Sequence, residues 1–380
     1  MILDHSRRSL LKMIAAGFIA VLSGLYGFTK ILTGSKSMRK NNNSIISISA
    51  LPETGPWPTI DPFLFCVHHN DVFPQAKRDL SPDASLIGRN IGNDFSNNGG
   101  WSMYHGEKIP GFPRHPHRGF ETLTVVSEGI IDHADSLGAS ARYGDGDAQW
   151  LTAGDGINHS EMFPLFNQKE KNKLDFFQIW LNLPSYNKRV APNFEMYWKG
   201  DIPKIPGDSK INRNSEVELV SGDFMGISAP SAPVNSWAND KNNDVAVWII
   251  RLDSDGEFNI PITKSGANRH LYVLKHSKIE IDGENIIGGA MIAIDSSKST
   301  MIKNLGNKTK LLMLQGVPIN EPVVKYGPFV MNTNSEIEQA FFDYNKTKFG
   351  GWEWGDSDPV HGKEKEKFAK FINGETSRPS

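Results

Sequence analysis

The stretch His115-Pro116-His117 decides the fold, because it sets two histidines two residues apart around a proline. Proline has no amide hydrogen and biases the residue before it toward extended backbone, which excludes a helix here. Residues i and i+2 of an extended chain point to the same side, so both imidazoles face one point. The tripeptide His159-Ser160-Glu161 presents an imidazole and a carboxylate in the same way. Together the two tripeptides predict a metal centre on extended segments.

The predicted metal ligands are His115, His117, His159 and Glu161. Nitrogen and carboxylate donors without sulfur suit Fe(II), Mn, Ni, Co or Cu(II) in a redox enzyme, and they also suit Zn. Four protein ligands would leave two positions open on an octahedral metal, enough for a substrate oxygen and dioxygen. One such tripeptide alone would be weak evidence, since alternate histidines also occur on solvated strands.

The segments around these tripeptides predict an all-β fold. From about residue 45 to 183, short apolar segments are bounded by Gly, Asn, Asp and Pro, as in Glu121–Val126 and Phe176–Leu181. This spacing is typical of a β-barrel or sandwich. A second set follows, with Val245–Ile250, Leu271–Leu274, Ile279–Ile281 and Leu311–Leu314.

These segments predict four parts of the chain. A signal or anchor and its linker occupy residues 1–44, a metal-binding β domain 45–183, and a second β domain without metal 184–352. A polar surface tail follows at 353–380, and Pro184 to about Pro192 is the expected hinge between the domains.

One helix is expected late in the second domain. Ser335 with Glu338 forms a capping box, and apolar residues recur at helical spacing until Gly350-Gly351 ends the run. The apolar face of this helix, which carries Phe341 and Tyr344, is expected to pack in a core.

The N-terminus has the form of an export signal. Arg7-Arg8 is followed by an uncharged run from Met13 to Thr29, and the arginine pair resembles a bacterial twin-arginine signal. An ordinary signal or a helical anchor is the alternative. The sequence before Met38 has no Ala-x-Ala cleavage site, so cleavage and retention at the inner membrane both stay open. Twin-arginine export machinery is thus an expected partner, and the outer face of the inner membrane or the periplasm the expected location.

The composition argues against nucleic-acid binding and against cysteine-based structural sites. Lys+Arg number 41 and Asp+Glu 43, so a net charge of −2 gives no electrostatic reason to expect nucleic-acid binding. The single cysteine, Cys66, excludes an intramolecular disulfide and a cysteine-based zinc cluster.

Three longer motifs resemble those of the pirin family. They are PGFPRHPHRGFET (110–122), GDAQWLTAGDGINHSE (146–161) and GPFVMNTN (327–334). The resemblance spans about Pro62 to Gly362. It implies a bicupin, that is, two facing β-barrels with metal only in the first. By position, the family's metal ligands fall on the four residues derived above.

Three further residues are candidates around the site. His133 stands where family members commonly have histidine, so it is either a hydrogen-bonding neighbour of the ligands or a hydrogen-bonded loop residue. Gln149 either lines the pocket or packs in the barrel. Many relatives have arginine where this chain has Asp155, and that charge reversal puts the substrate class in doubt.

The resemblance also implies a function. Some pirin-like proteins are quercetin 2,3-dioxygenases, so we expect a metal-dependent dioxygenase that acts with O2 on a small, flavonol-like aromatic substrate. Glu161 would be both ligand and catalytic base, and Fe(II) is the first choice of metal. The alternative is a non-catalytic metal-binding or redox-sensing protein that acts through a protein partner. Export argues against a transcriptional role.

Overall fold

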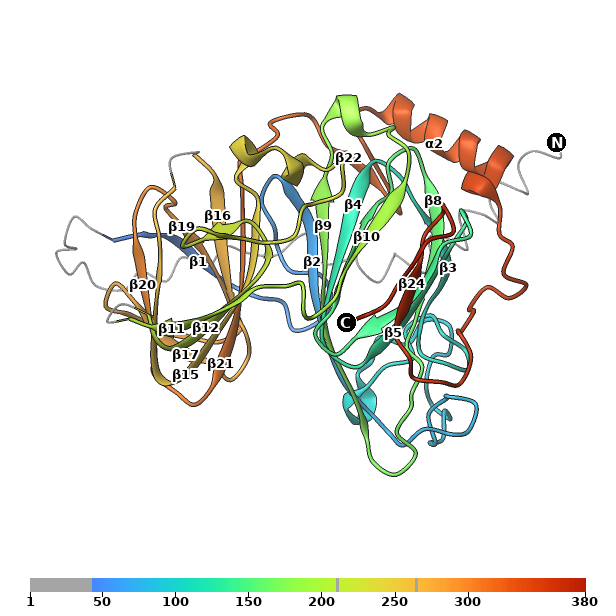
Figure 1. Cartoon of the computed structure of the whole chain (residues 1–380), viewed down its shortest axis with the longest axis horizontal. Helices are drawn as coiled ribbons and strands as arrows, with labels where there is room; N and C mark the ends of the chain where they lie inside the picture. The colour runs from blue at the N-terminus through green and yellow to red at the C-terminus, as the bar shows by residue number, and fades with distance from the viewer. Residues whose placement is uncertain (1–42, 210–211, 264–265) are drawn as a thin grey trace. The chain divides into compact units, whose positions relative to one another are not determined.

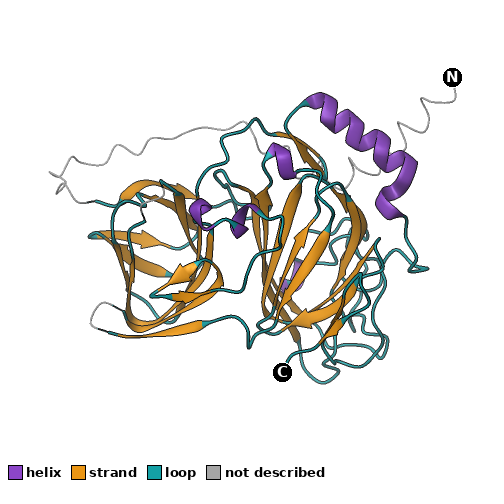
Figure 2. Ribbon diagram, turned by 45° about the horizontal axis from the view of Figure 1, so that its top comes forward, coloured by secondary structure: helices purple, strands orange, loops and turns teal. Residues whose placement is uncertain are grey.

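Strands make up most of the regular structure of the chain, as its short, turn-bounded apolar segments predict (Figure 2). The computed structural model describes residues 43–209, 212–263 and 266–380. Within them the chain divides into two compact units, and the predicted all-β class is confirmed.

The first unit contains residues 67–199 and 321–380 and is built around two antiparallel sheets. One sheet has the strand order β25-β24-β6-β5-β8-β3, and the other has the order β10-β7-β4-β9-β2 (Figure 1). The elements of this unit are β2 Phe63–Phe73, β3 Gly111–His117, β4 Phe120–Glu128, β5 Ile130–Asp135, β6 Ser140–Gly144, β7 Ala148–Thr152, β8 Ile157–Met162, β9 Asn172–Asn182, β10 Asn193–Tyr197, β22 Val324–Tyr326, β23 Phe329–Met331, α2 Asn334–Thr347, β24 Phe368–Lys370 and β25 Thr376–Ser377.

The second unit contains the described residues 43–66 and 200–320. Its main sheet follows the order β1-β19-β16-β21-β15-β20-β17-β18, with β12 on β15 and β11 on β12. The strands are β1 Ile45–Ala50, β11 Lys204–Asp208, β12 Arg213–Ser221, β13 Asp223–Phe224, β14 Ile227–Ser228, β15 Ala246–Ile260, β16 Asn268–Val273, β17 Lys278–Ile281, β18 Glu284–Ile287, β19 Ala290–Ile294, β20 Thr300–Asn304 and β21 Thr309–Gly316.

The two units differ from the predicted domains at both ends of the first domain and at the end of the second, because residues 321–352, with α2, lie in the first unit. Strand β1 pairs with β19 through partners such as Ile48 and Ile292, so residues 45–66 belong to the second unit. Strand β10 pairs with β7, so the first unit continues past the expected hinge at 184–192 as far as Lys199. The sequence of a strand does not identify the strand with which it pairs. The sequence therefore did not predict these boundaries correctly.

The C-terminal segment also differs from the prediction of a surface tail. Strand β24 pairs with β6, with Ala369 opposite Ala141, and Ala369 is fully buried. Figure 1 shows this segment, in dark red, running back to the sheet of β5 and β3. The Lys367 Nζ lies 2.8 Å from a carboxylate oxygen of buried Asp147. In the charged run 363–367 only Lys367 is half-buried, while residues 363–366 are exposed as predicted.

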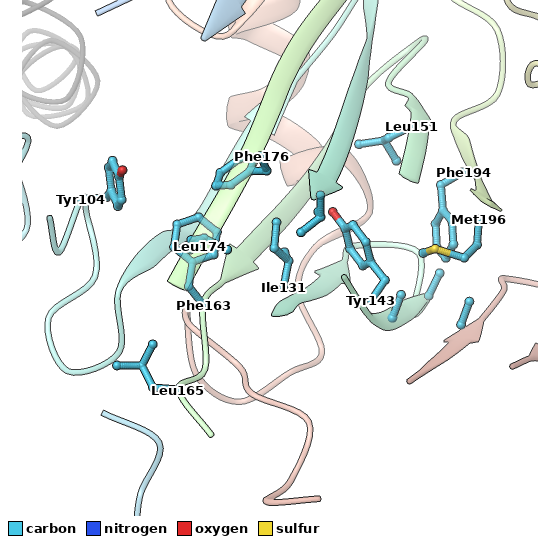
Figure 3. Close-up of a cluster of buried hydrophobic side chains, with 14 of the residues drawn as sticks. Tyr104, Ile131, Tyr143, Leu151, Phe163, Leu165, Leu174, Phe176, Phe194 and Met196 are labelled. Carbon is cyan, nitrogen blue, oxygen red and sulfur yellow. The ribbon is translucent and has the colours of Figure 1, made fainter. Parts of the chain in front are cut away.

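Each unit has an apolar core cluster and also buries polar side chains. In the second unit the cluster includes Trp248, Leu271, Ile292 and Met313, and His270 and Gln315 are among the buried polar residues. The first unit has a comparable apolar cluster, shown in Figure 3. It also buries histidine, glutamate, glutamine and threonine side chains on β4, β5, β8 and β9. Buried polar groups of this kind need partners, so they mark where a function is to be sought.

Helix α2 confirms the predicted helix, but its capping box begins two residues earlier than expected. The Thr333 Oγ1 accepts a hydrogen bond from the Glu336 amide at 3.2 Å, and the Glu336 carboxylate accepts one from the Thr333 amide at 2.8 Å. Ser335 and Glu338 fit the same spacing, so the sequence alone offered two registers. The expected aromatic face packs as predicted, with Phe341 and Tyr344 against the cluster around Phe329.

The predicted export signal lies outside the described residues. Within the described part of the chain, no helix is long and apolar enough to cross a membrane.

The cap of α2 can be tested by two serine/threonine substitutions. We expect Thr333→Ala to lower the free energy of unfolding by about 1 kcal/mol, because it removes the acceptor for a helix amide. Ser335→Ala is the matched control and should change it by no more than about 0.5 kcal/mol. Urea unfolding followed by circular dichroism measures both. A larger loss for Ser335→Ala than for Thr333→Ala would show that the cap lies at the later position.

Candidate metal centre

The ladder between β3 and β8 brings the two histidine tripeptides together. His115 lies directly opposite His159 in this antiparallel pair, and the register shifts between Phe112 and His115. Residues directly opposite one another point to the same face of a sheet. His117 and Glu161, each two residues further along its strand, share that face.

Glycine is required where β3 begins against β8. Gly111 has a φ of +141°, and a β-carbon there would lie 2.5 Å from the main-chain oxygen of Glu161. Any side chain would push the two strands apart next to the site.

The three imidazoles form a tight cluster. One ring nitrogen from each of His115, His117 and His159 lies within 4.8 Å of the others. The ring centroids are separated by 4.4 Å for His115 and His159, 4.8 Å for His115 and His117, and 4.9 Å for His117 and His159. The structure thus brings together three of the four predicted ligands.

Burial keeps these imidazoles neutral. It lowers the pKa of His115 to about 4, although the hydrogen bond to the Pro113 carbonyl opposes the shift. Burial also lowers the pKa values of His117 and His159 well below 6.5, and neighbouring imidazoles lower them further. A metal-binding histidine must be unprotonated, so all three are ready to bind at neutral pH. Protons compete with a metal for His115 only as the pH falls close to 4.

The ring nitrogens fit a metal ion. His115 donates from Nδ1 to the Pro113 carbonyl at 2.9 Å, an outer hydrogen bond of the kind that orients metal-binding histidines. Among the described residues, the buried Nδ1 of His117 and both ring nitrogens of His159 have no hydrogen-bond partner. An unpaired buried nitrogen is costly, and a divalent metal would satisfy it. The donor set suits such a metal without selecting one.

Glu161, the fourth predicted ligand, lies beside this cluster. Its Oε2 is 4.0 Å from the His159 Nε2 and accepts a hydrogen bond from the Gln178 amide at 2.6 Å. Its Oε1 accepts one from the Thr124 hydroxyl at 3.2 Å. Burial raises the pKa of Glu161, while His133 and these two donors counteract part of the rise. The carboxylate is therefore held by two donors at the edge of the imidazole cluster.

His133 lies in strand β5, next to the cluster, and not in a loop. It is directly opposite Glu161 in the ladder between β5 and β8, and its ring centroid is 5.6 Å from that of His159. Its Nε2 lies 3.1 Å from an Asp135 carboxylate oxygen. Because Asp135 fixes one ring nitrogen, the imidazole is oriented at the site's border.

Gln149 is buried among polar side chains of the first unit. The buried Gln149 side chain accepts a long hydrogen bond, 3.5 Å, from the Tyr143 hydroxyl. Tyr143 in turn is close enough to Glu161 for this carboxylate to raise its pKa, after the larger effect of burial. Gln149 thus joins the polar interior on the Glu161 side.

The structure places Asp155 in an ion-pair network and not in the histidine cluster. Its carboxylate accepts hydrogen bonds from Arg189 at 2.6 Å and lies 3.2 Å from Arg118, which also pairs with Asp343 of α2 at 2.8 Å. The charge reversal noted in the sequence is therefore balanced by two arginines. These pairs tie the turn after β7 to the helix.

Sequence reasoning missed Thr124, Gln178 and Asp135, which hold Glu161 and His133 in place. The sequence pattern could have identified Gln178, because it is a lone polar residue in the apolar run Phe176–Leu181. Thr124 alternates with apolar residues in the same way. Both are inward-facing polar positions in otherwise buried strands, but their partners lie on other strands.

The fold and the site together define a class of protein. Both units have the cupin fold, and the first contains a cluster of three histidines suited to a divalent metal. This makes the chain a cupin protein with two cupin domains.

Comparisons with known proteins identify the family. The family model described as Pirin matches residues 58–181, and the model described as Pirin C-terminal cupin domain matches residues 247–350. The chain belongs to the pirin family.

Relatives and solved structures agree with this assignment. A Pseudomonas aeruginosa protein with the provisional name quercetin 2,3-dioxygenase is 32% identical over 240 residues, covering 63% of this chain and 79% of the relative. Human pirin is 31% identical, over 65% of this chain and 80% of its own. The crystal structure of an Acinetobacter baumannii protein titled quercetin 2,3-dioxygenase has a TM-score of 0.64 at 24% identity, covering 82% of this chain and 99% of its own. This last similarity is one of fold.

Removal of one imidazole tests the centre. We expect the wild-type chain to bind about one divalent transition metal, and His117→Ala to lose most of it, since one of few ligands is gone. The exposed His276 of the second unit provides the control, His276→Asn. Elemental analysis after metal loading and desalting measures both variants. Equal metal content in His117→Ala and wild type would overturn the site assignment.

Proposed function

We propose that this chain is a metal-dependent dioxygenase that acts on a flavonol-like aromatic substrate with O2. The observation that carries the proposal is the pairing of three converging neutral imidazoles with a buried carboxylate 4.0 Å from one of them. A metal site beside a positioned base can bind an acidic hydroxyl and take its proton.

His115, His117 and His159 would hold the metal, with Glu161 as fourth ligand or neighbouring base. A divalent metal bound there supplies a Lewis acid for the substrate's hydroxyl group and a redox centre for dioxygen. We propose Fe(II) first, because nitrogen and carboxylate donors with open positions are typical of non-haem iron oxygenases; Mn, Ni, Co, Cu and Zn are the alternatives.

Glu161 is the proposed catalytic base. Its carboxylate is buried, and burial raises its pKa, which makes it a stronger proton acceptor than an exposed glutamate. The Gln178 and Thr124 donors fix both oxygens, so the base is positioned before the substrate arrives. The proton of the substrate hydroxyl would pass to this carboxylate.

Aromatic side chains surround the cluster and limit access of water. The ring of His117 lies 5.0 Å from that of Phe120 and 5.4 Å from that of Trp180, and the His115 ring is 6.4 Å from Phe112. Apolar walls of this kind strengthen electrostatic interactions inside the site and favour an aromatic substrate.

The names of similar proteins support the activity. The Pseudomonas aeruginosa relative and the Acinetobacter baumannii structure both carry the name quercetin 2,3-dioxygenase. Others with similar identity are named only as pirins. A second candidate is therefore a non-catalytic metal-binding or redox-sensing protein that acts through a partner. The deep burial of His117 and His159, 2% and 0% exposed, favours this candidate because it restricts access of a large substrate.

The substitution Glu161→Gln distinguishes the two candidates. It keeps the size of the side chain but removes the base, so flavonol turnover per bound metal should fall by ~10²–10⁴. Glu128→Gln makes the same chemical change at an exposed position of β4 and should leave turnover unaltered. Oxygen consumption over a flavonol panel is the measurement. No oxygen uptake by wild-type protein loaded in turn with Fe(II), Mn, Ni, Co and Cu would exclude the dioxygenase and leave the binding protein.

We also propose that the chain is exported through the twin-arginine machinery and works in the periplasm or on the outer face of the inner membrane. The Arg7-Arg8 pair and the uncharged run after it support this location.

Replacing Arg7 and Arg8 together by lysine should leave the protein in the cytoplasm, because the twin-arginine route depends on the arginine pair. Cell fractionation of wild type and the double variant measures this. Recovery of the double variant outside the inner membrane would favour the general secretory route.

A further inference from the structure

The segment that follows α2 crosses the sheet that carries the candidate metal centre. We call residues 348–370 the C-terminal strap. Nearly all of it lies beyond residue 350, where the match to the pirin C-terminal cupin model ends. It belongs to the first unit and ends in β24, which pairs with β6 of the six-stranded sheet.

Two side chains of the strap hold the backbone of β5. The indole Nε1 of Trp354 donates to the Asp135 carbonyl at 2.7 Å. The Nε2 of His361 lies 2.7 Å from the His133 carbonyl and donates to it. His133 and Asp135 are the pair whose side chains border the cluster. The strap therefore holds the main chain of the residues that orient one side of the site.

The strap also holds the two strands that carry the histidine ligands. On β3, the amide of Arg114 donates to the Ser357 carbonyl at 2.7 Å. On β8, the side-chain amide of Asn158 donates to the Lys348 carbonyl. Arg114 directly precedes His115, and Asn158 directly precedes His159. The strap therefore contacts each of these two strands at the residue just before a predicted metal ligand.

A buried ion pair anchors the middle of the strap. The Arg142 guanidinium binds both oxygens of Asp132, at 2.7 and 2.6 Å, and donates to the carbonyls of Gly362 and Glu364. Asp132 also accepts a hydrogen bond from the His361 amide at 2.8 Å. Both charged side chains are buried, so the strap carbonyls satisfy donors that would otherwise be costly.

We propose that the C-terminal strap is a positioning element that fixes the geometry of the three-histidine centre through the backbones of β3, β5 and β8. Its contacts meet all three strands at, or one residue from, the residues whose side chains face the cluster. Neighbours that orient metal ligands typically change metal affinity 10- to 100-fold. The inference rests on the metal site of the proposed function and not on the identity of the substrate.

Two ring-conserving substitutions test this role. Trp354→Phe and His361→Phe each keep an aromatic ring but remove the donor to β5. We expect either one to weaken Co(II) binding by ~10–100-fold and to shift the visible absorption of the bound Co(II). The matched control is Trp237→Phe, which likewise removes an indole hydrogen bond, here to the Val317 carbonyl at 3.3 Å in the second unit. Competition with a coloured chelator gives the affinities.

A purely structural role predicts a different result. In that case the variants would lower the stability of the metal-free protein but bind Co(II) as tightly as Trp237→Phe, and the proposal would be refuted. If the two variants do not fold, hydrogen exchange of wild-type protein decides the matter. By linkage, Co(II) should slow exchange of the His361 amide while amides of β20 in the second unit stay unchanged. Equal exchange with and without Co(II) would refute the proposal.

These readouts separate the strap from the proposed activity. A failure of flavonol turnover leaves the comparison of Co(II) affinities intact. A wild-type chain that binds no Co(II) would remove both the metal centre and the proposal for the strap.

Discussion

The register between β3 and β8 is the constraint on which the site depends. A shift of one residue would turn every side chain of a strand to the opposite face and separate His115 from His159. The structure fixes this register by close backbone approach at Gly111, where a β-carbon would collide with Glu161. The register shifts between Phe112 and His115, and after this irregularity His115 lies directly opposite His159.

The register places polar groups where most barrels have apolar ones. Both units bury apolar clusters and polar side chains, but among the described residues only the first unit brings three imidazoles together beside a buried carboxylate. The same fold thus supports a packed core in one unit and a candidate reactive centre in the other, because function is set by the lining and not by the fold. Unpaired nitrogens on His117 and His159 are unfavourable in the metal-free chain. Hydrogen bonds from Gln178, Thr124 and the strap hold the surrounding groups in position.

Much of this could be predicted from the sequence, and the physical reasons are specific. The spacing of His115-Pro116-His117 fixes which side chains share a face, because alternation is a local property of an extended chain. The strands Glu121–Val126 and Phe176–Leu181 and the helix after Asn334 were predicted for the same reason. Partners far along the chain were not predictable. The pairing of β1 with β19 and of β24 with β6, and the contacts of Gln178, each depend on a second segment that local periodicity does not identify. Asp155 was expected at the pocket because its charge is unusual there, but the arginines that neutralise it come from two other loops.

The central claim is that His115, His117 and His159 bind one metal ion together. X-ray absorption of the zinc-loaded wild-type protein tests this claim most directly, since it reports the atoms around the metal itself. The account predicts a first shell of nitrogen and oxygen at roughly 2.0–2.1 Å, with the outer-shell scattering of three imidazole rings. A first shell of oxygen alone, or the scattering of no more than one imidazole, would contradict it.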